Sequence, residues 1–251
     1  ALAKPRWLFL VRHAESTWNR ATARGDVATM LTQTDHPLSR AGAAQAVALR
    51  EALDAASRST GDALERAFLA SKLLIASPSR RTAQTALAAL RDHPAAAEAG
   101  VVLRSDWREV RGVGRDNLAS AVGDAIRARA VAGLDGDDDA WPAVDAGDAA
   151  TAWWAAGADD DRSVNRRVSR ALGQLMLSPE PSVIVTTHSN FVRRLFRAEG
   201  AMVSRAFASR KLQNCGVIAV RVEFDAPAGA RFAEARLLFG SGFVGDTAAD
   251  G

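Results

Sequence analysis

The sequence predicts an α/β fold, a three-layer α/β/α arrangement with a mostly parallel central sheet and an antiparallel edge. Four short apolar runs bounded by turn residues are typical of buried strands: residues 7–11, 73–76, 101–103 and 183–185. Three of these runs are followed by segments with helical spacing. This alternation indicates a parallel sheet that carries helices on both faces.

Four helices are expected from apolar spacing and capping residues. Ser39 is a suitable N-cap for a helix that continues to Leu53, and a second helix should follow Ser79. A third helix should follow the acidic residues 159–161, whose charges suit the positive end of a helix dipole. The fourth has an apolar face made of Phe191, Val192, Leu195 and Phe196.

The antiparallel edge is predicted near the C-terminus. Apolar Ile218, Val220, Val222 and Phe224 alternate with Ala219, Arg221 and Glu223, as in a strand with one face exposed. A turn at residues 225–230 then leads to the run 237–239. Residues 111–161, rich in Gly, Asp and Ala, predict a partly helical insertion or lid within a single domain that spans residues 1–251.

Composition excludes several classes of protein. The net charge is +3, and the basic residues are scattered instead of clustered, so no nucleic-acid partner is expected. The single cysteine, Cys215, excludes an internal disulfide and a cysteine-based zinc site, and we expect a buried thiol there. No stretch approaches the roughly 18–20 apolar residues that span a bilayer, and no signal peptide is visible. We therefore expect a cytoplasmic protein without a membrane partner.

Four separated segments place His, Arg and Glu where predicted strands end, which is where open α/β sheets bind ligands. Arg12 and His13 follow the first run, and residues 77–86 follow the second. Glu109 lies after the third run, and His188 ends the fourth. Two of the four histidines thus occupy equivalent positions, which indicates one shared site.

These residue types suit phosphoryl transfer, which needs mainly positioning and neutralisation of charge. Arg12 and Arg81 carry planar, permanently charged groups that match phosphate oxygens, and a helix starting just after His13 would direct free N–H groups at an anion. A neutral His13 can attack phosphorus and form a phosphohistidine. This chemistry requires no metal and no cofactor.

The remaining roles follow from the same chemistry. Glu109, with a pKa raised by burial, can protonate the leaving oxygen and later activate water. His188 can donate a hydrogen bond to the equatorial oxygens in the transition state. Asn19 can add a neutral donor.

The motifs together resemble those of the histidine phosphatase (phosphoglycerate mutase-like) superfamily. Residues 12–19, Arg-His-Ala-Glu-Ser-Thr-Trp-Asn, resemble its Arg-His-Gly-Glu signature, with Ala14 in place of glycine. Residues 35–46 resemble its Pro-Leu-Ser turn and the following Gly-x-x-Gln-Ala helix. In residues 77–86, Ser-Pro leads four residues on to a phosphate-binding Arg, which selects Arg81 over Arg80. Residues 107–109 resemble the element that carries the proton donor, and His188 corresponds to the second catalytic histidine.

The resemblance implies a phosphomonoester hydrolase with a phosphohistidine on His13, acting on a small phosphorylated substrate or a phosphoprotein. The alternatives are a phosphoglycerate mutase and a non-catalytic phosphate-binding module. The sequence after Asn19 lacks the Gly-Trp-x-Asp pattern of cofactor-dependent mutases, which favours the phosphatase. Ser189 and Asn190 stand where small glycines are common and, like Arg20 and Arg24, are candidates for substrate specificity.

Four further expectations concern other residues. Arg20 and Arg24 either meet a second phosphate on a bisphosphorylated substrate or lie on a solvated helix face. Arg193 and Arg194 are expected to face solvent. Trp153 and Trp154 either cap the pocket or anchor the insertion to the core, and the acidic run 137–139 is expected to be hydrated and not a cation site.

Overall fold

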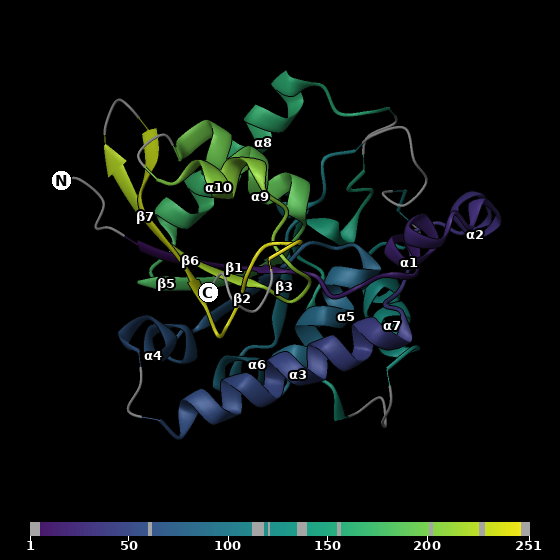
Figure 1. The fold of residues 1–251 in the computed structure, drawn as a ribbon, viewed down its shortest axis with the longest axis horizontal. Helices are drawn as coiled ribbons and strands as arrows, with labels where there is room; N and C mark the ends of the chain where they lie inside the picture. Colours follow the sequence, from purple (N-terminus) through teal and green to yellow (C-terminus); the bar gives the residue numbers. More distant parts are fainter. Residues whose placement is uncertain are drawn as a thin grey trace.

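One sheet of seven strands runs through the residues that the structure, a computed structural model, describes: 6–59, 62–111, 118–119, 121–134, 140–154, 157–200, 203–225 and 229–246. The strand order is β4-β3-β2-β5-β1-β6-β7 (Figure 1). The strands are β1 (Arg6–Arg12), β2 (Leu73–Ala76), β3 (Val101–Leu103), β4 (Val144–Asp145), β5 (Ser182–Thr187), β6 (Val217–Asp225) and β7 (Gly229–Leu238). Strands β4, β3, β2, β5 and β1 pair in parallel, whereas β6 and β7 are antiparallel additions.

The predicted strands and the antiparallel edge are confirmed, but the expected turn at residues 225–230 was too long: β6 continues to Asp225, and β7 begins at Gly229 and ends at Leu238. The four apolar runs form β1, β2, β3 and β5, and β1 lies between β5 and β6. The expected alternation in β6 was wrong at Ala219, which is buried like its neighbours because the first half of β6 is covered on both faces. Strand β4 was not predicted, since two residues are too few to produce a period.

Helices cover both faces of the sheet, as predicted (Figure 1). One layer packs on Phe9, Leu74 and Ile184 of the sheet. It contains α3 (Arg40–Ser57), α4 (Ala63–Leu69), α5 (Arg80–Ala89), α6 (Pro94–Glu98) and α7 (Asp124–Val131). The other layer packs on Leu8, Leu10 and Val185 and contains α8 (Asp161–Leu177), α9 (Ser189–Glu199) and α10 (Arg205–Ser209). Helices α1 (Thr17–Arg24) and α2 (Val27–Thr32) lie beyond one end of the sheet (Figure 1).

The helix starts follow their caps. Ser39 Oγ accepts a hydrogen bond from the Gly42 amide at 3.0 Å, which fixes the first turn of α3. Asp160 does the same for α8 by accepting from the Ser163 amide. Gly42 is required for a second reason: a Cβ there would come within 1.9 Å of the carbonyl oxygen of Glu15. Helix α3 therefore lies directly against the segment that follows His13.

Helix α1 begins later than predicted, at Thr17 and not directly after His13. The amides of Ala14 and Glu15 bind the side chains of Thr85 and Gln45 at 3.0 and 2.8 Å, so they are used in tertiary contacts and not in a helix. Ser16 then caps α1 in a reciprocal capping box with Asn19.

The segment 111–161 contributes to the core as well as to the surface. It contains α7, as a partly helical segment should, and the edge strand β4. Trp141 and Trp153 are buried in the same core as α5, and Trp153 Nε1 donates to the Ala121 carbonyl at 3.1 Å. Trp153 thus anchors the segment, whereas Trp154 is 39% exposed. The acidic run 137–139 lies outside the described residues.

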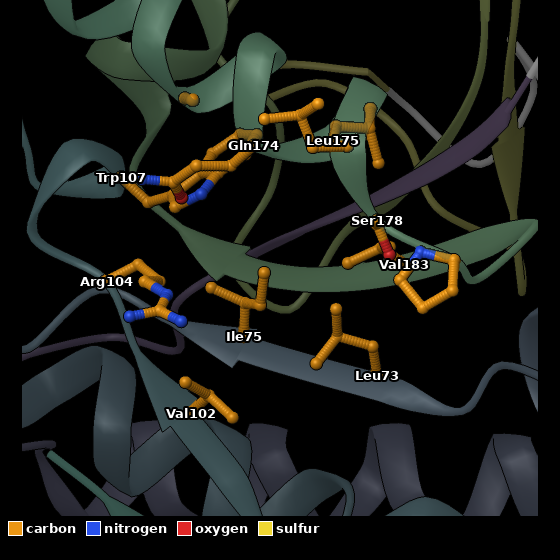
Figure 2. Close-up of a pocket in the computed structure, with 12 residues that line it drawn as sticks. Leu73, Ile75, Val102, Arg104, Trp107, Gln174, Leu175, Ser178 and Val183 are labelled. Carbon is orange, nitrogen blue, oxygen red and sulfur yellow. The ribbon is translucent and has the colours of Figure 1, made fainter. Parts of the chain in front are cut away.

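An apolar groove of ≈ 340 Å³ lies between the end of α8 and strands β2 and β3 (Figure 2). Leu73, Ile75 and Val102 form its floor, and Leu175 and Gln174 lie on the helix above them. None of the predicted site residues lines this groove. Within the described ranges, no helix is both long enough and apolar enough to cross a membrane.

Candidate active site

A polar pocket lies where β1, β2 and β5 end. Because these parallel neighbours share one edge of the sheet, the segments after them converge there. The pocket has a volume of ≈ 350 Å³, and the described residues that line it are Arg12, His13, Ser16, Trp18, Asn19, Thr22, Ala23, Arg81, Glu109, Ser189, Asn190, Arg193 and Lys211. The structure therefore brings together residues that the sequence separates by up to about 200 positions.

His13 presents one unprotonated ring nitrogen. Its Nδ1 lies 2.7 Å from the Ala14 carbonyl oxygen, and a carbonyl can only accept, so Nδ1 carries the proton and Nε2 keeps its lone pair. Burial and the charges of Arg81 and Arg12 hold the pKa of His13 well below its usual 6.5. His13 is therefore a neutral imidazole, the form that can act as a nucleophile.

Arg12 is a buried cation beside His13. It is 2% exposed, and its Nη1 donates to the Leu212 carbonyl. Its Nε has no hydrogen-bond partner, and it forms no ion pair with a described residue. Burial lowers the pKa of Arg12 to about 10, while the charge of Glu109 acts in the opposite direction. An anion in the pocket would supply the missing counter-charge.

Arg81 lines the pocket and contacts His188, which is fully buried and is not itself among the lining residues. Arg81 Nη2 lies 3.2 Å from His188 Nδ1, and because a guanidinium only donates, Nδ1 is the acceptor. The proton of His188 is then on Nε2, which donates to Ser77 Oγ at 2.9 Å. The His188 ring is 5.1 Å from that of His13, between centroids, and its pKa is well below 6.5 because of burial and the Arg81 charge.

Glu109 receives its hydrogen bonds from backbone amides. Its Oε1 accepts from Val110 and Phe191 at 2.8 and 2.9 Å, and its Oε2 accepts from Asn190 at 3.3 Å. The carboxylate thereby caps the start of α9, whose own N-cap, His188, makes no side-chain cap bond. Burial nevertheless raises the pKa of Glu109 above its usual 4.5.

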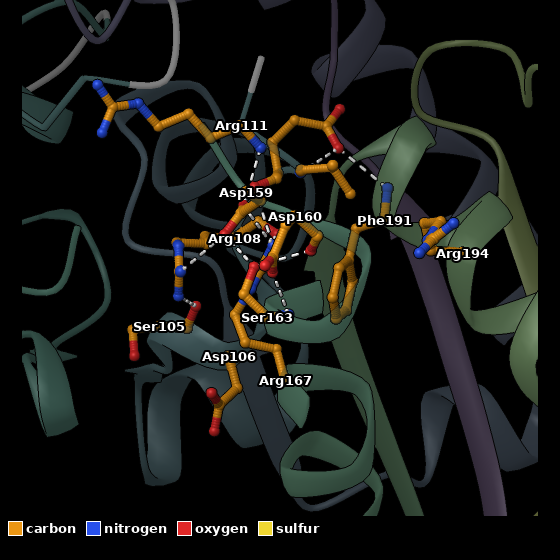
Figure 3. A network of polar contacts seen from close by, with 12 residues as sticks. Ser105, Asp106, Arg108, Arg111, Asp159, Asp160, Ser163, Arg167, Phe191 and Arg194 are labelled. Atoms are coloured by element: carbon orange, nitrogen blue, oxygen red, sulfur yellow. Dashed lines mark hydrogen bonds and ion pairs between the residues drawn. The ribbon is translucent and has the colours of Figure 1, made fainter. Parts of the chain in front are cut away.

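A buried ion cluster fixes the segment that carries Glu109 (Figure 3). Arg167 of α8 donates to the carbonyls of Arg108 and Glu109 at 2.7 and 3.4 Å, and to Asp159 at 2.8 Å. Asp159 also accepts from the Arg111 amide at 2.9 Å. The backbone on both sides of Glu109 is therefore held to the start of α8.

Arg193 and Lys211 also line the pocket. The expectation that Arg193 faces solvent is only partly correct: the residue is half-buried, lies one helical turn after Ser189 and lines the pocket with it. Helical spacing from His188 could have revealed it. Lys211 carries no comparable signal, because the chain after α10 brings it to the pocket. It precedes Leu212, whose carbonyl accepts from Arg12.

The other specificity candidates are divided between two hollows. Ser189, Asn190 and Asn19 line the pocket, and Asn19 Oδ1 accepts from Ser16, which leaves its amide NH₂ for other contacts. Arg20 and Arg24 line a separate surface hollow with Glu15 and Arg40. The described part of the chain contains no group of three or more His, Cys, Asp or Glu side chains that could hold a metal ion.

One family model matches most of the chain. The family model of the histidine phosphatase superfamily (branch 1) matches residues 8–234. Comparison of the sequence with curated proteins finds no match.

Solved structures share the fold at low identity. A mycobacterial glucosyl-3-phosphoglycerate phosphatase, solved with VO₃, is 19% identical, with a TM-score of 0.54 over 92% of this chain and 96% of that chain. The ecdysone phosphate phosphatase of Bombyx mori, solved with tungstate, is 18% identical, with a TM-score of 0.52 over 86% and 89% of the two chains.

Proposed function

Since the chain belongs to the histidine phosphatase superfamily, we propose that it hydrolyses phosphate monoesters through a phosphohistidine on His13 and needs no metal ion. One observation carries the proposal: the pocket is lined by a neutral, buried His13 with an unprotonated Nε2 and by the buried Arg12, which forms no ion pair with a described residue. Such a pocket is suited to bind a phosphate dianion and attack it.

In the first step, the lone pair of His13 Nε2 attacks phosphorus in line with the ester oxygen. The new N–P bond forms as the P–O ester bond breaks, and its electrons go to the leaving oxygen. Glu109 in its protonated form, which burial favours by raising its pKa, gives that oxygen its proton and releases the alcohol. Arg12 and Arg81 neutralise charge on the remaining phosphoryl oxygens.

In the second step, a water molecule attacks the phosphohistidine. Glu109, now a carboxylate, takes a proton from that water, and the N–P bond breaks. The electrons return to His13 Nε2, and inorganic phosphate leaves. His188 can assist in both steps by accepting from Arg81 at Nδ1, which orients that guanidinium. A bond from Nδ1 to a phosphoryl oxygen would require the other tautomer, with the proton on Nδ1.

The structural neighbours support the reaction class. Both are phosphatases by name, and both were solved with oxyanions, VO₃ and tungstate, that resemble phosphate in shape and charge. We therefore expect a small phosphorylated substrate, and vanadate should compete with it in the pocket.

The test is hydrolysis of 4-nitrophenyl phosphate, measured as released phosphate with and without EDTA. We expect activity that EDTA does not change and that the His13→Ala variant loses by roughly 10⁴-fold or more, because the nucleophile is gone. The matched control is His93→Asn, because His93 is a buried histidine outside the pocket whose N-cap role asparagine can keep.

A second measurement separates the phosphatase from a phosphoglycerate mutase. With 3-phosphoglycerate and a trace of 2,3-bisphosphoglycerate, a phosphatase releases phosphate and a mutase accumulates 2-phosphoglycerate. Retention of activity by His13→Ala, or its loss in EDTA, would overturn the proposed mechanism.

A further inference from the structure

The excess of cationic over acidic side chains in the pocket is larger than one phosphate group can neutralise. Among the described lining residues there are four cationic side chains, those of Arg12, Arg81, Arg193 and Lys211, and one carboxylate, that of Glu109. A phosphate monoester dianion matches two of these positive charges. If Glu109 holds a proton as the acid, two positive charges are left without a matching anion.

Arg193 is held in place without a counter-ion. Its Nη2 donates to the side-chain oxygen of Asn190, and its Nη1 donates to the Ser209 carbonyl at 3.5 Å. Both acceptors are neutral, and no ion pair joins Arg193 to a described carboxylate. Its neighbour Arg194, by contrast, pairs with Asp161 at 2.8 Å. The guanidinium is thus oriented, and its charge is not neutralised.

Lys211 lines the same pocket as Arg193, and its main chain is held by hydrogen bonds. The Val244 amide donates to its carbonyl at 2.7 Å, and the next residue, Leu212, accepts from Arg12. Partial burial and the charges of Arg12 and Arg193 lower the pKa of Lys211. All three cations line the same pocket, so an anion bound there would relieve their mutual repulsion.

We infer that Arg193 and Lys211 form a second anion subsite at the pocket mouth, which takes a carboxylate or a second phosphate of the substrate. The inference rests on the proposed function and narrows its substrates to phosphate monoesters that carry another anionic group. The organic part of such a substrate would extend from His13 along Trp18 and Thr22 of α1, which line the same pocket. Arg20 and Arg24, the earlier candidates for this role, line the other hollow.

The experiment compares substrates matched in size that differ in the second anion. The pairs are 3-phosphoglycerate with glycerol 3-phosphate, for a carboxylate, and fructose 1,6-bisphosphate with fructose 6-phosphate, for a phosphate. In at least one pair, we expect the wild-type protein to have a kcat/KM about tenfold or more higher for the member that carries the second anion. Hydrogen bonds to charged groups contribute a binding free energy of that size. The pair with the larger ratio identifies the second anion.

The ratio of kcat/KM between the two members of a pair should fall towards one in the Arg193→Gln/Lys211→Met variant. It should fall part of the way in each single variant. Arg197→Gln is the matched control, because Arg197 is exposed on the same helix and does not line the pocket. It should keep the wild-type ratio. Circular dichroism and the thermal midpoint check that each variant is folded.

Binding to the His13→Ala variant, measured by calorimetry with the same four compounds, separates the two proposals. If no compound is hydrolysed by the wild-type protein, the proposed function fails, and the ratio of Kd values still tests the subsite. If neither pair shows a preference, or if the double variant keeps the wild-type preference, the second anion subsite is overturned.

Discussion

Two buried arginines, Arg12 in the pocket and Arg167 in the cluster behind Glu109, have opposite surroundings. Both are almost fully buried, at 2% and 1% exposure, and burial lowers the pKa of each to about 10. Arg167 has the Asp159 carboxylate at 2.8 Å and two carbonyl acceptors. Arg12 has one carbonyl acceptor and no ion pair with a described residue.

The difference shows how the same residue type can serve structure or ligand binding. Burial of a charge costs several kcal/mol, and only a close counter-ion with good hydrogen bonds offsets it. At Arg167 that counter-ion belongs to the protein, so the group holds two segments together. At Arg12 no described carboxylate forms an ion pair, and we propose that an anionic ligand takes that place, which would make the pocket pre-organised for an anion at a cost in stability.

The largest effect is expected where the charges are paired. Arg167→Met leaves Asp159 buried without its main partner and should lower the free energy of unfolding by about 3–5 kcal/mol, measured in urea. Arg166→Met, at the exposed neighbouring position, is the control and should change it little. The double variant Arg167→Met/Asp159→Leu should regain part of the loss. Equal stability of Arg167→Met and the wild-type protein would contradict the structural role of the pair.

Arg12→Met should have the opposite effect to Arg167→Met: a large loss of activity and a small loss of stability. We expect kcat/KM for 4-nitrophenyl phosphate to fall roughly 10²–10³-fold, or about 3–4 kcal/mol, because one donor to the phosphoryl oxygens is lost. The free energy of unfolding should fall by no more than about 1 kcal/mol, since the variant removes an uncompensated charge and loses one hydrogen bond. A loss of stability as large as that of Arg167→Met would remove the contrast between the two arginines.

Glu109 lines the pocket, and its backbone is held by the cluster around Arg167. Substitution of Glu109 should have the smallest effect on activity, and the size of that effect should depend on the leaving group. Glu109→Gln should reduce hydrolysis of glycerol 3-phosphate about 10²-fold and affect 4-nitrophenyl phosphate much less, because nitrophenolate leaves without a proton. Glu199→Gln is the matched control, because burial also raises the pKa of Glu199 and it lies outside the pocket. Similar losses with both substrates would argue against an acid role for Glu109.

The dependence of kcat/KM on pH tests the same acid role of Glu109. Burial lowers the pKa of His13 well below 6.5 and raises that of Glu109 above 4.5, so both shifts favour the neutral imidazole together with the protonated acid. In the wild-type protein, kcat/KM should fall as the pH rises through the raised pKa of Glu109. That alkaline decline should be absent in Glu109→Gln, and its persistence would assign the decline to another group.

Local patterns predicted most of the elements correctly. Buried strands and capped helices leave a signal within a few residues, as at Ser39 and Asp160. The predictions were wrong or missing for segments whose structure depends on contacts with residues far away in the sequence. The amides after His13 bind Thr85 and Gln45 instead of starting a helix, and the two residues of β4 become a strand only by pairing with β3.

The sequence by itself determined the order of the strands along the chain, the helix caps and the residue types available for phosphate chemistry. Each of these depends on neighbours within about one turn or one strand, so the pattern alone contains it. Only the tertiary structure decided that Arg193 and Lys211 join the pocket while Arg20 and Arg24 do not. It also decided which buried arginine has a counter-ion, since burial and charge pairing depend on segments that meet only in the folded chain.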